Sequence, residues 1–509
     1  MNLIPSRNEA SLAYWCSWHT QNVVAAIRRE ELHSSENAAS MKQGAEGACS
    51  ARAMLNEDLL FGPDGYAYQF EDVRGDLYLM LDDGWDVDYG INPDKRPECF
   101  GSLEMSEERF PSVKGHSPAM RLKMINDRVK ALGWKGIGIW VAAQRAAEDC
   151  DAPYGERDRD YWRERVLWCR EAGVEYWKVD WGTQAGNVDF RRALTEIGRE
   201  LYPALTIEHA VCIGPVNAHD HPDEALRGRY AGMGWVAELS KEIASESQVF
   251  RSYDVLNALA IPTTLDRVAF LLAHAPGFVN GEDECYLNAA LGCHNGIMRS
   301  HYCQKVAIES EDSRGLRLGE ATAALRWQRL APAFAGTAIA CSEEILFDDR
   351  FYHPGDSWWG GANGQTLVQG APAVVARNLS VDSVRVRAET KPYVAVSLNP
   401  NGAYTVAVLP RVVAGKWHYP EAEIWCDIPA ATDTVGVFGE NADIHLNFTG
   451  RVKLVLAQSL LEDEAHELTE GITETSEGCT VTLTGEQIKR LFGAHDMSAP
   501  ALVIRVLRE

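Results

Sequence analysis

The stretch VEYWKVDWG, residues 174–182, joins a short apolar run to a charged end. Its first half is rich in β-branched and aromatic residues, as buried strands are, and Gly173 in front of it would end the helical pattern RDYWRERVLWCREAG. Lys178 and Asp180 are two positions apart, so both side chains would point to the same side of a strand. The stretch therefore predicts a buried strand with a charged pair at its carboxyl end.

Further runs of this kind lie in the first part of the chain, and helical patterns separate most of them. They are AYWCSW (13–18), LYLMLDDGW (77–85), GIGIWVAA (136–143), ALTIEHAV (204–211), VFRSYDVL (249–256) and GFVNGED (277–283). Strands buried on both faces of a parallel sheet form such near-continuous runs. The alternation predicts an α/β fold, a (β/α)8 TIM barrel over residues 1–345. The run at 277–283 would be its eighth strand, and the seventh has no clear place because IPTTLDRVAFLLAHA indicates a helix.

The pattern changes after residue 345. A loop rich in Gly and Trp, HPGDSWWGGANG, precedes many short alternating segments such as VRVRAET, YVAVSLN, AYTVAVLP and VKLVLA, separated by turn residues. Alternation with a period of two, without helices between the segments, is typical of antiparallel sheets. We therefore expect a C-terminal all-β sandwich domain over residues 346–509.

The composition of the chain limits the kinds of partner that we expect it to bind. The chain has 509 residues, a formal net charge of −24 and an isoelectric point near 5.1, so the negatively charged surfaces of nucleic acids and membranes are not expected partners. Neither a secretory leader nor an apolar run of about 18 residues is visible. The 12 cysteines are scattered without a CxxC pair, which favours free thiols and a cytoplasmic location. A homo-oligomer stays open.

Polar residues gather where the predicted strands end. In a parallel barrel, functional side chains lie at the carboxyl ends of the strands. Cleavage of a glycosidic bond needs such a set of carboxylates, and aromatic faces suit sugar rings. The residues at these ends are Asp82, Asp83, Lys178, Asp180, Glu208, His209, Arg251, Asp254, Glu282, Asp283 and Glu284.

Asp180 and Asp254 are the candidate catalytic pair. Lys178 would keep Asp180 ionised and ready to attack, although a purely structural Lys–Asp pair would have the same spacing. Asp254 would act as acid and base, for which it must hold a proton near neutral pH. Arg251 would then contact the substrate or support Asp180; a surface Arg–Asp pair is the alternative interpretation.

Other motifs have competing interpretations. Asp82 and Asp83 can both face a site only if the chain already turns at Gly84, and a DDG triplet is also an ordinary turn signal. Two groups could imitate metal sites, but no metal is expected at either of them, because neither has a ligand spacing or a place in the chain that fits one. They are His219-Asp220-His221, and Cys285, Cys293 and Cys303 with His294 and His301.

Taken together, these residues resemble the α-galactosidases of glycoside hydrolase clan D, chiefly family 27 and more loosely family 36. The resemblance covers about residues 13–285. It rests on the ordered segments YWCSW, LDDGW, ERFPSVKGHSPAMRLKMINDRVKALGWKGIGIWV and YWKVDWG. It implies a retaining, exo-acting α-glycosidase, foremost an α-galactosidase, which acts on an oligosaccharide or glycoside and needs no cofactor.

The resemblance also implies a role for each matching position. Asp180 would be the nucleophile, and Asp254 the acid/base. The residues that would bind the sugar are Trp18, Asp82, Asp83, Trp140, Lys178, Glu208 and Arg251.

The chain departs from the family pattern at several points. Asp254 follows Arg251 by three positions instead of the usual four, and Trp181 replaces a cysteine that many secreted members have. EHAVC replaces the usual Glu-Trp after the fifth strand, which can alter the substrate pocket. The large N-terminal β-domain of family 36 is absent.

Alternatives from the same and other classes stay open. Within clan D they are a β-L-arabinopyranosidase, an α-N-acetylgalactosaminidase, an isomaltose-type α-glucosidase or a transglycosylase; Glu208 favours a free 2-hydroxyl over an N-acetyl group. A carbohydrate-binding protein without turnover is a further alternative. So is a metal-dependent barrel hydrolase that uses His209, His219 and His221.

Overall fold

The structure is a computed structural model of the 509-residue chain. The structure describes residues 1–32, 51–86, 101–147, 149–150, 152–211, 234–252, 260–302, 317–352, 365–413, 415–476, 478–495 and 498–508.

The first part of the chain forms a closed parallel barrel, as predicted. Its eight strands follow one another in sequence order around the sheet, and every neighbouring pair is parallel. A parallel bridge between Asn280 and His294 joins the seventh strand to the segment that leads into the eighth and closes the ring. The strands are β1 (Tyr14–Cys16), β2 (Tyr78–Leu81), β3 (Gly136–Val141), β4 (Tyr176–Val179), β5 (Thr206–Ala210), β6 (Val249–Arg251), β7 (Phe278–Asn280) and β8 (Gly296–Ile297).

The strand count corrects one detail of the sequence prediction. The run at 277–283 contains β7, not the eighth strand, so Glu282, Asp283 and Glu284 follow the seventh strand. The eighth strand is only the pair Gly296–Ile297. It lies within CHNGIMRSH, where polar residues surround the two strand positions and no apolar run marks them.

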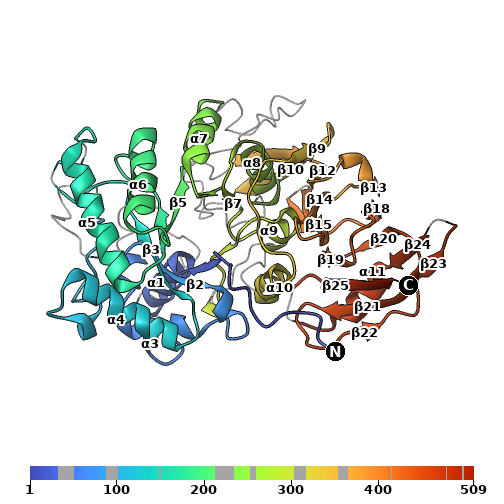
Figure 1. Ribbon diagram of the computed structural model, residues 1–509, viewed down its shortest axis with the longest axis horizontal. Helices are drawn as coiled ribbons and strands as arrows, with labels where there is room; N and C mark the ends of the chain where they lie inside the picture. The colour runs from blue at the N-terminus through green and yellow to red at the C-terminus, as the bar shows by residue number, and fades with distance from the viewer. Residues whose placement is uncertain are drawn as a thin grey trace.

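Helices lie around the barrel (Figure 1). The stretch IPTTLDRVAFLLAHA is helical, as its pattern predicts, and the helix before β4 ends at Gly173 in the left-handed conformation, with φ 66°. The helices of this part are α1 (Trp18–Leu32), α3 (Glu57–Phe61), α4 (Pro118–Ala131), α5 (Glu156–Ala172), α6 (Val188–Leu201), α7 (Gly234–Glu246), α8 (Ala260–His274), α9 (Cys285–Leu291) and α10 (Leu318–Gln328).

The strands alternate between the barrel interior and the surrounding helices. On β1, Trp15 packs into the large apolar core outside the barrel, whereas Tyr14 and Cys16 belong to a separate buried cluster. On β4, Trp177 likewise faces outward and Tyr176 faces inward. Alternation of this kind lets a short strand contribute both to the core and to a site inside the barrel.

The C-terminal part is built of β-strands. One sheet has the order β22-β21-β25-β19-β15-β14-β12-β9 and a second has the order β13-β18-β20-β24-β23. Tyr404 of β15 and Cys426 of β18 are both fully buried and face one another between the two sheets. The elements are β9 (Ile339–Cys341), β10 (Ile345–Tyr352), β11 (Gln365–Pro372), β12 (Val374–Arg377), β13 (Val384–Arg387), β14 (Tyr393–Leu398), β15 (Tyr404–Leu409), β16 (Arg411–Val413), β17 (Lys416–His418), β18 (Ala422–Asp427), β19 (Thr434–Phe438), β20 (Ala442–Thr449), β21 (Val452–Ser459), β22 (His466–Glu467), β23 (Ile472–Glu474), β24 (Gly478–Leu483), α11 (Gly485–Phe492) and β25 (Ala501–Arg508).

The two parts share chain segments at their border. Residues 339–341 form β9, which pairs with β12. The C-terminal sheet therefore includes residues that precede the predicted boundary at residue 345. The N-terminus lies beside β21 and β22 (Figure 1), where the Leu3 amide donates to Gln458 Oε1 at 2.7 Å. The β-rich part therefore holds the chain's first residues as well as its last.

None of the helices among the described residues combines the length and the apolar character that a membrane span requires. The eight cysteines among these residues are all free thiols.

Candidate active site

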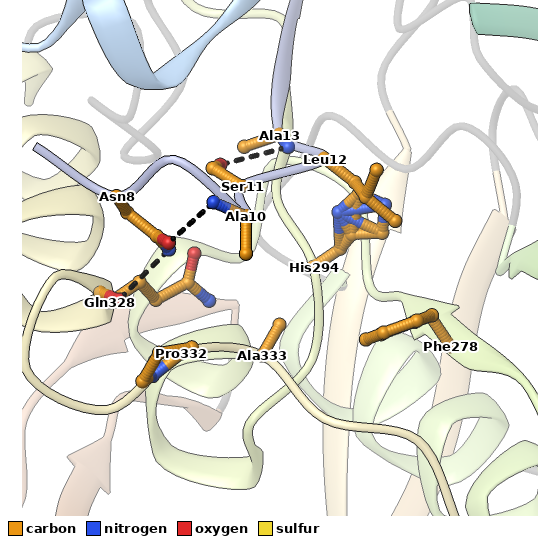
Figure 2. Close-up of a pocket in the computed structure, with 10 residues that line it drawn as sticks. All are labelled: Asn8, Ala10, Ser11, Leu12, Ala13, Phe278, His294, Gln328, Pro332 and Ala333. Carbon is orange, nitrogen blue, oxygen red and sulfur yellow. Dashed lines mark hydrogen bonds between the residues drawn. The ribbon is translucent and has the colours of Figure 1, made fainter. Parts of the chain in front are cut away.

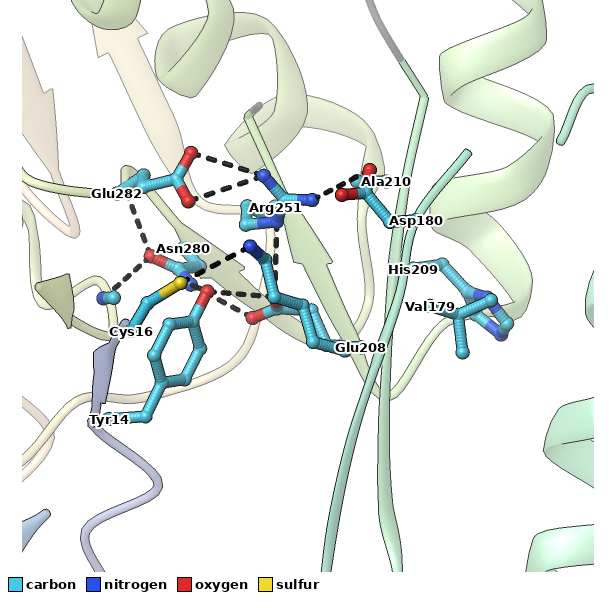
Figure 3. A network of polar contacts seen from close by, with 12 residues as sticks. Tyr14, Cys16, Val179, Asp180, Glu208, His209, Ala210, Arg251, Asn280 and Glu282 are labelled. Carbon is cyan, nitrogen blue, oxygen red and sulfur yellow. Dashed lines mark hydrogen bonds and ion pairs between the residues drawn. The ribbon is translucent and has the colours of Figure 1, made fainter. Parts of the chain in front are cut away.

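Arg251 lies at the centre of a buried cluster of charges at the carboxyl ends of the barrel strands. Its Nη2 is 3.1 Å from Asp180 Oδ1, its Nε is 3.2 Å from Glu208 Oε1, and its Nη1 is 3.2 Å from both carboxylate oxygens of Glu282. Figure 3 shows the guanidinium between Glu282 on one side and Asp180 on the other. One cation therefore links a carboxylate within β5 to carboxylates that follow β4 and β7.

Asp180 directly follows β4 and is held from several directions. Its amide donates to the carbonyl of Val141, and its own carbonyl accepts from Arg191 Nη2 at 2.7 Å. Oδ2 of its side chain accepts a hydrogen bond from Trp140 Nε1 at 3.0 Å. Only 5% of the residue is exposed, so the carboxylate is fixed on a rigid part of the barrel.

Lys178 pairs with a carboxylate other than Asp180. Its Nζ lies 2.7 Å from Asp82 Oδ2, and both side chains are almost fully buried. The thiol of Cys16 donates to the same Asp82 oxygen at 3.0 Å. Burial raises the pKa of this thiol well above its ordinary value, so Cys16 stays protonated and acts as a donor. The groups that the structure places against the Asp180 carboxylate are Arg251 and Trp140.

Asp82 and Asp83 diverge, as adjacent positions at a strand end must. Asp83 Oδ1 lies 2.9 Å from Arg52 Nε, with both side chains buried. Burial raises the pKa of Asp83 to about 7. The chain turns at Gly84, where φ is 116° and a Cβ would collide with the backbone of Arg52. Of the two aspartates, Asp82 is the one that contacts Lys178.

Glu208 is surrounded by protein donors. Oε1 accepts from the Tyr14 hydroxyl at 3.0 Å and lies near Arg251, while Oε2 accepts from the Tyr176 hydroxyl at 2.9 Å and from Asn280 Nδ2 at 2.8 Å. Its exposed fraction is 0%. A carboxylate has about four acceptor positions. The predicted contact of Glu208 with a sugar hydroxyl would therefore require one of these partners to be displaced.

Three tryptophans lie near the strand ends. Trp140 is buried and touches Asp180, whereas Trp181, the next residue along from Asp180, is 41% exposed and packs edge-on against Trp140. Trp18 begins α1 and packs, half-buried, against the cluster inside the barrel. Trp181 is the aromatic face most open to a substrate among these three.

The acidic residues after β7 take separate roles. Glu282 contacts Arg251 and has a positive φ of 42°, a strained conformation for a residue other than glycine. Asp283 accepts from the amide of Met298 at 2.9 Å and pairs with Arg299. Glu284 is the N-cap position of α9. Only Glu282 joins the cluster around Arg251.

The metal alternatives gain no support from the described residues. No group of three or more His, Cys, Asp or Glu side chains among them could hold a metal ion. His209 points away from the barrel interior and toward α6. There its ring contacts Thr195 Oγ1 at 2.9 Å and Arg191 Nη1 at 3.4 Å. Burial lowers its pKa well below the ordinary value. His219, Asp220, His221 and Cys303 lie outside the described residues.

Asp254, the predicted acid/base, also lies outside the described residues, so the structure does not place it relative to Asp180. Arg251, three positions before it, ends β6 on the side of the barrel where Asp180 lies.

The charges of the cluster favour a cationic species. The carboxylates of Asp82, Asp180, Glu208 and Glu282 outnumber the two cations, Lys178 and Arg251. Burial raises the pKa of Glu208, which lessens this excess. Fixed negative charge in a water-poor site stabilises positive charge that develops on a substrate. Such charge develops on the sugar ring in glycoside cleavage.

Several residues of this cluster have no place in the sequence predictions. Tyr14, Tyr176 and Asn280 all bind Glu208, and Cys16 binds Asp82. A signal for Tyr176 was present, because it lies two positions before Lys178 and so on the same side of β4. Nothing local marks Asn280 or Cys16, since their partners come from distant strands.

Fold and site together define a (β/α)8 barrel with a buried carboxylate cluster at the strand ends. No protein-family model matches the chain, and no curated protein matches it. Solved structures to which it is similar include a glycoside hydrolase family 27 β-L-arabinopyranosidase from Geobacillus stearothermophilus in complex with arabinose. There the identity is 11%, the coverage 90% of this chain and 94% of the other, and the TM-score 0.40.

Two other similar structures have related descriptions. An α-galactosidase from Saccharomyces cerevisiae shows 10% identity and a TM-score of 0.31, with 68% of this chain and 67% of the other covered. An α-amylase from Geobacillus thermoleovorans complexed with acarbose shows 9% identity and a TM-score of 0.36, with 85% and 88% covered. Likenesses this distant do not decide the chemistry of the site.

Proposed function

We propose that this chain is a retaining, exo-acting α-glycosidase that hydrolyses terminal α-linked galactose. The observation that carries the proposal is the environment of Asp180, whose two carboxylate oxygens face Arg251 and Trp140 at the end of a barrel strand. The ordered likeness of YWCSW, LDDGW and YWKVDWG to clan D supports the choice of sugar.

In the proposed reaction Asp180 attacks the anomeric carbon and Asp254 protonates the leaving oxygen. The bond from carbon to the leaving oxygen breaks as the bond to the carboxylate forms, which gives a covalent glycosyl-enzyme. Asp254 then takes a proton from water, and this water releases the sugar. Two inversions at the anomeric carbon give net retention.

The remaining residues would bind and orient the sugar. Asp82, held by Lys178 and Cys16, is suited to accept hydrogen bonds from ring hydroxyls. Trp181 offers an exposed aromatic face beside the nucleophile. Asp83 and Glu208 are engaged by protein partners and would act through them.

The test uses wild type, Asp180→Ala and Asp180→Gly on a panel of aryl glycosides. We expect turnover of the α-galactoside by wild type and its loss in Asp180→Ala. Azide should restore cleavage in Asp180→Gly and yield a product of inverted configuration. Equal rates for wild type and Asp180→Ala would refute the nucleophile. Turnover of another glycoside in the panel would reassign the sugar, and loss of activity with a chelator would favour a metal-dependent hydrolase.

A further inference from the structure

A cavity lies at the opposite end of the barrel from Asp180. It has a volume of about 80 Å³ and is lined by residues that precede β1, begin β7 and precede β8, together with the end of α10 and the segment after it. Figure 2 shows His294 and Phe278 on one side of it and Gln328 on the other. A water molecule needs roughly 10–15 Å³ of such volume. The cavity therefore has room for water at the barrel floor.

His294 links this cavity to the charge cluster. The residue lines the cavity, and its Nε2 lies 3.3 Å from the Tyr176 hydroxyl. That hydroxyl donates to Glu208 Oε2 at 2.9 Å, and Glu208 lies 3.2 Å from Arg251 Nε. Arg251 in turn lies 3.1 Å from Asp180. Polar contacts thus run without a break from the barrel floor to the candidate nucleophile.

The donor at each step can be assigned. Burial lowers the pKa of His294 to about 4, so its ring is neutral at neutral pH and has one donor nitrogen and one acceptor nitrogen. When Glu208 is ionised, the Tyr176 hydroxyl must donate to it, so Nε2 of His294 must donate to the phenol oxygen. This arrangement favours the charged form of Glu208.

We propose that Tyr176 and His294 are positioning residues that control the charge of Glu208 from the barrel floor, and that Glu208 in turn holds Arg251 against Asp180. A proton can reach the fully buried carboxylate along the same contacts. A hydronium ion of cavity water gives a proton to Nδ1 of His294, Nε2 releases its proton to the phenol oxygen, and the phenol proton passes to Glu208. After the transfer the cavity holds a neutral water molecule, the neutral His294 ring has its proton on Nδ1, and the carboxyl of Glu208 is protonated.

Other charged and titratable groups also face Glu208. They are Tyr14 from β1, Lys178 from β4 and Arg251 from β6, and the two cations oppose the effect of burial on its pKa. Tyr78 faces Tyr176 but does not contact Glu208; its hydroxyl donates to Glu175 Oε2 at 3.2 Å. Tyr78→Phe is therefore a matched control, because it removes the same phenol oxygen from a neighbouring ring that does not bind Glu208.

The test follows the infrared band of the protonated Glu208 carboxyl as the pH is raised. The band is assigned by its loss in Glu208→Gln. In Tyr176→Phe one donor to the charged form is lost, so we expect the band to persist to a pH about one unit higher than in wild type. His294→Phe should shift it in the same direction by less, and Tyr78→Phe should leave it unchanged.

Turnover provides the second measurement, and this part rests on the proposed function. In Tyr176→Phe the acid limb of kcat should move to higher pH with KM unchanged; a merely structural loss would lower kcat at every pH without moving the limb. Equal band titrations in Tyr176→Phe and Tyr78→Phe would overturn the inference. Should Tyr176→Phe not fold, an unshifted band in His294→Phe would do the same. Absence of glycosidase activity in wild type would refute the proposed function alone, because the band needs no substrate.

Discussion

Arg251 Nη2 lies 3.1 Å from Asp180 Oδ1, and the same guanidinium also contacts the carboxylates of Glu208 and Glu282. The side chain of Arg251 is fully buried, so these contacts are made without competition from bulk water. Buried ion pairs need good geometry to offset the cost of removing charge from water. The planar guanidinium meets the three carboxylates with three different nitrogen atoms, whereas the three donors of a lysine share one nitrogen.

Replacement of Arg251 by lysine tests this arrangement. The charge is kept, but a single ammonium nitrogen cannot take the places of the three guanidinium nitrogens that face Asp180, Glu208 and Glu282. We expect kcat on an aryl α-galactoside to fall by about 100-fold or more. Arg192→Lys is the control, because Arg192 lies on α6 with 41% of its side chain exposed. Wild-type kinetics in Arg251→Lys would show that charge alone suffices.

Trp140→Phe tests the second contact of Asp180. The variant keeps most of the ring but loses the Nε1 donor to Oδ2, so the carboxylate is less firmly oriented. We expect kcat to fall about tenfold, since hydrogen bonds to charged groups are among the stronger ones. Trp177→Phe is a matched control: its Nε1 bonds Cys169 on the outer side of the same sheet. Similar losses in both variants would point to packing and not to the contact with Asp180.

The sequence was most informative where a pattern is local. Alternating apolar runs and helices predicted the barrel, and Gly173 marked a helix end. Positions two apart, such as Lys178 and Asp180, could be expected on one side of the strand from their spacing alone. These features depend on neighbours within a few positions, which a single sequence displays.

Contacts between side chains of different strands could not be predicted in this way. Lys178 was expected to act on Asp180, but its ammonium group contacts Asp82 of the strand end two places away in the sheet. The choice depends on how far each strand is shifted along its neighbour and on which side chains the interior can hold. The two-residue β8 was missed for a similar reason, since its place is set by pairing with β1 and by the bridge to Asn280.

The pair of Lys178 and Asp82 gives a stability prediction. Both groups are buried and 2.7 Å apart, so removal of one leaves the other charged and uncompensated. We expect Lys178→Met or Asp82→Asn to lower the free energy of unfolding by about 3–5 kcal/mol, and the double variant to lose much less than the sum. Urea denaturation of the four proteins in a double-mutant cycle measures this. Additive losses would contradict a direct interaction.

Asp83 gives a prediction about pH. Its ordinary pKa is near 4, and burial raises it to about 7 in the folded protein. Between these values the folded protein keeps a proton that the unfolded chain has released. Unfolding then releases a proton, so rising pH favours the unfolded state over this range. The destabilisation is complete above pH 7, where both states are ionised.

The neutral variant Asp83→Asn lacks this dependence. We therefore expect the Tm of wild type, relative to that of Asp83→Asn, to fall by a few degrees as the pH rises from about 4 to about 7 and then to level off. Asp127→Asn is the control, because that side chain is 57% exposed. Calorimetric scans of the three proteins across this range make the comparison. A constant difference between wild type and Asp83→Asn would mean that Asp83 is already ionised at low pH, with Arg52 dominating over burial.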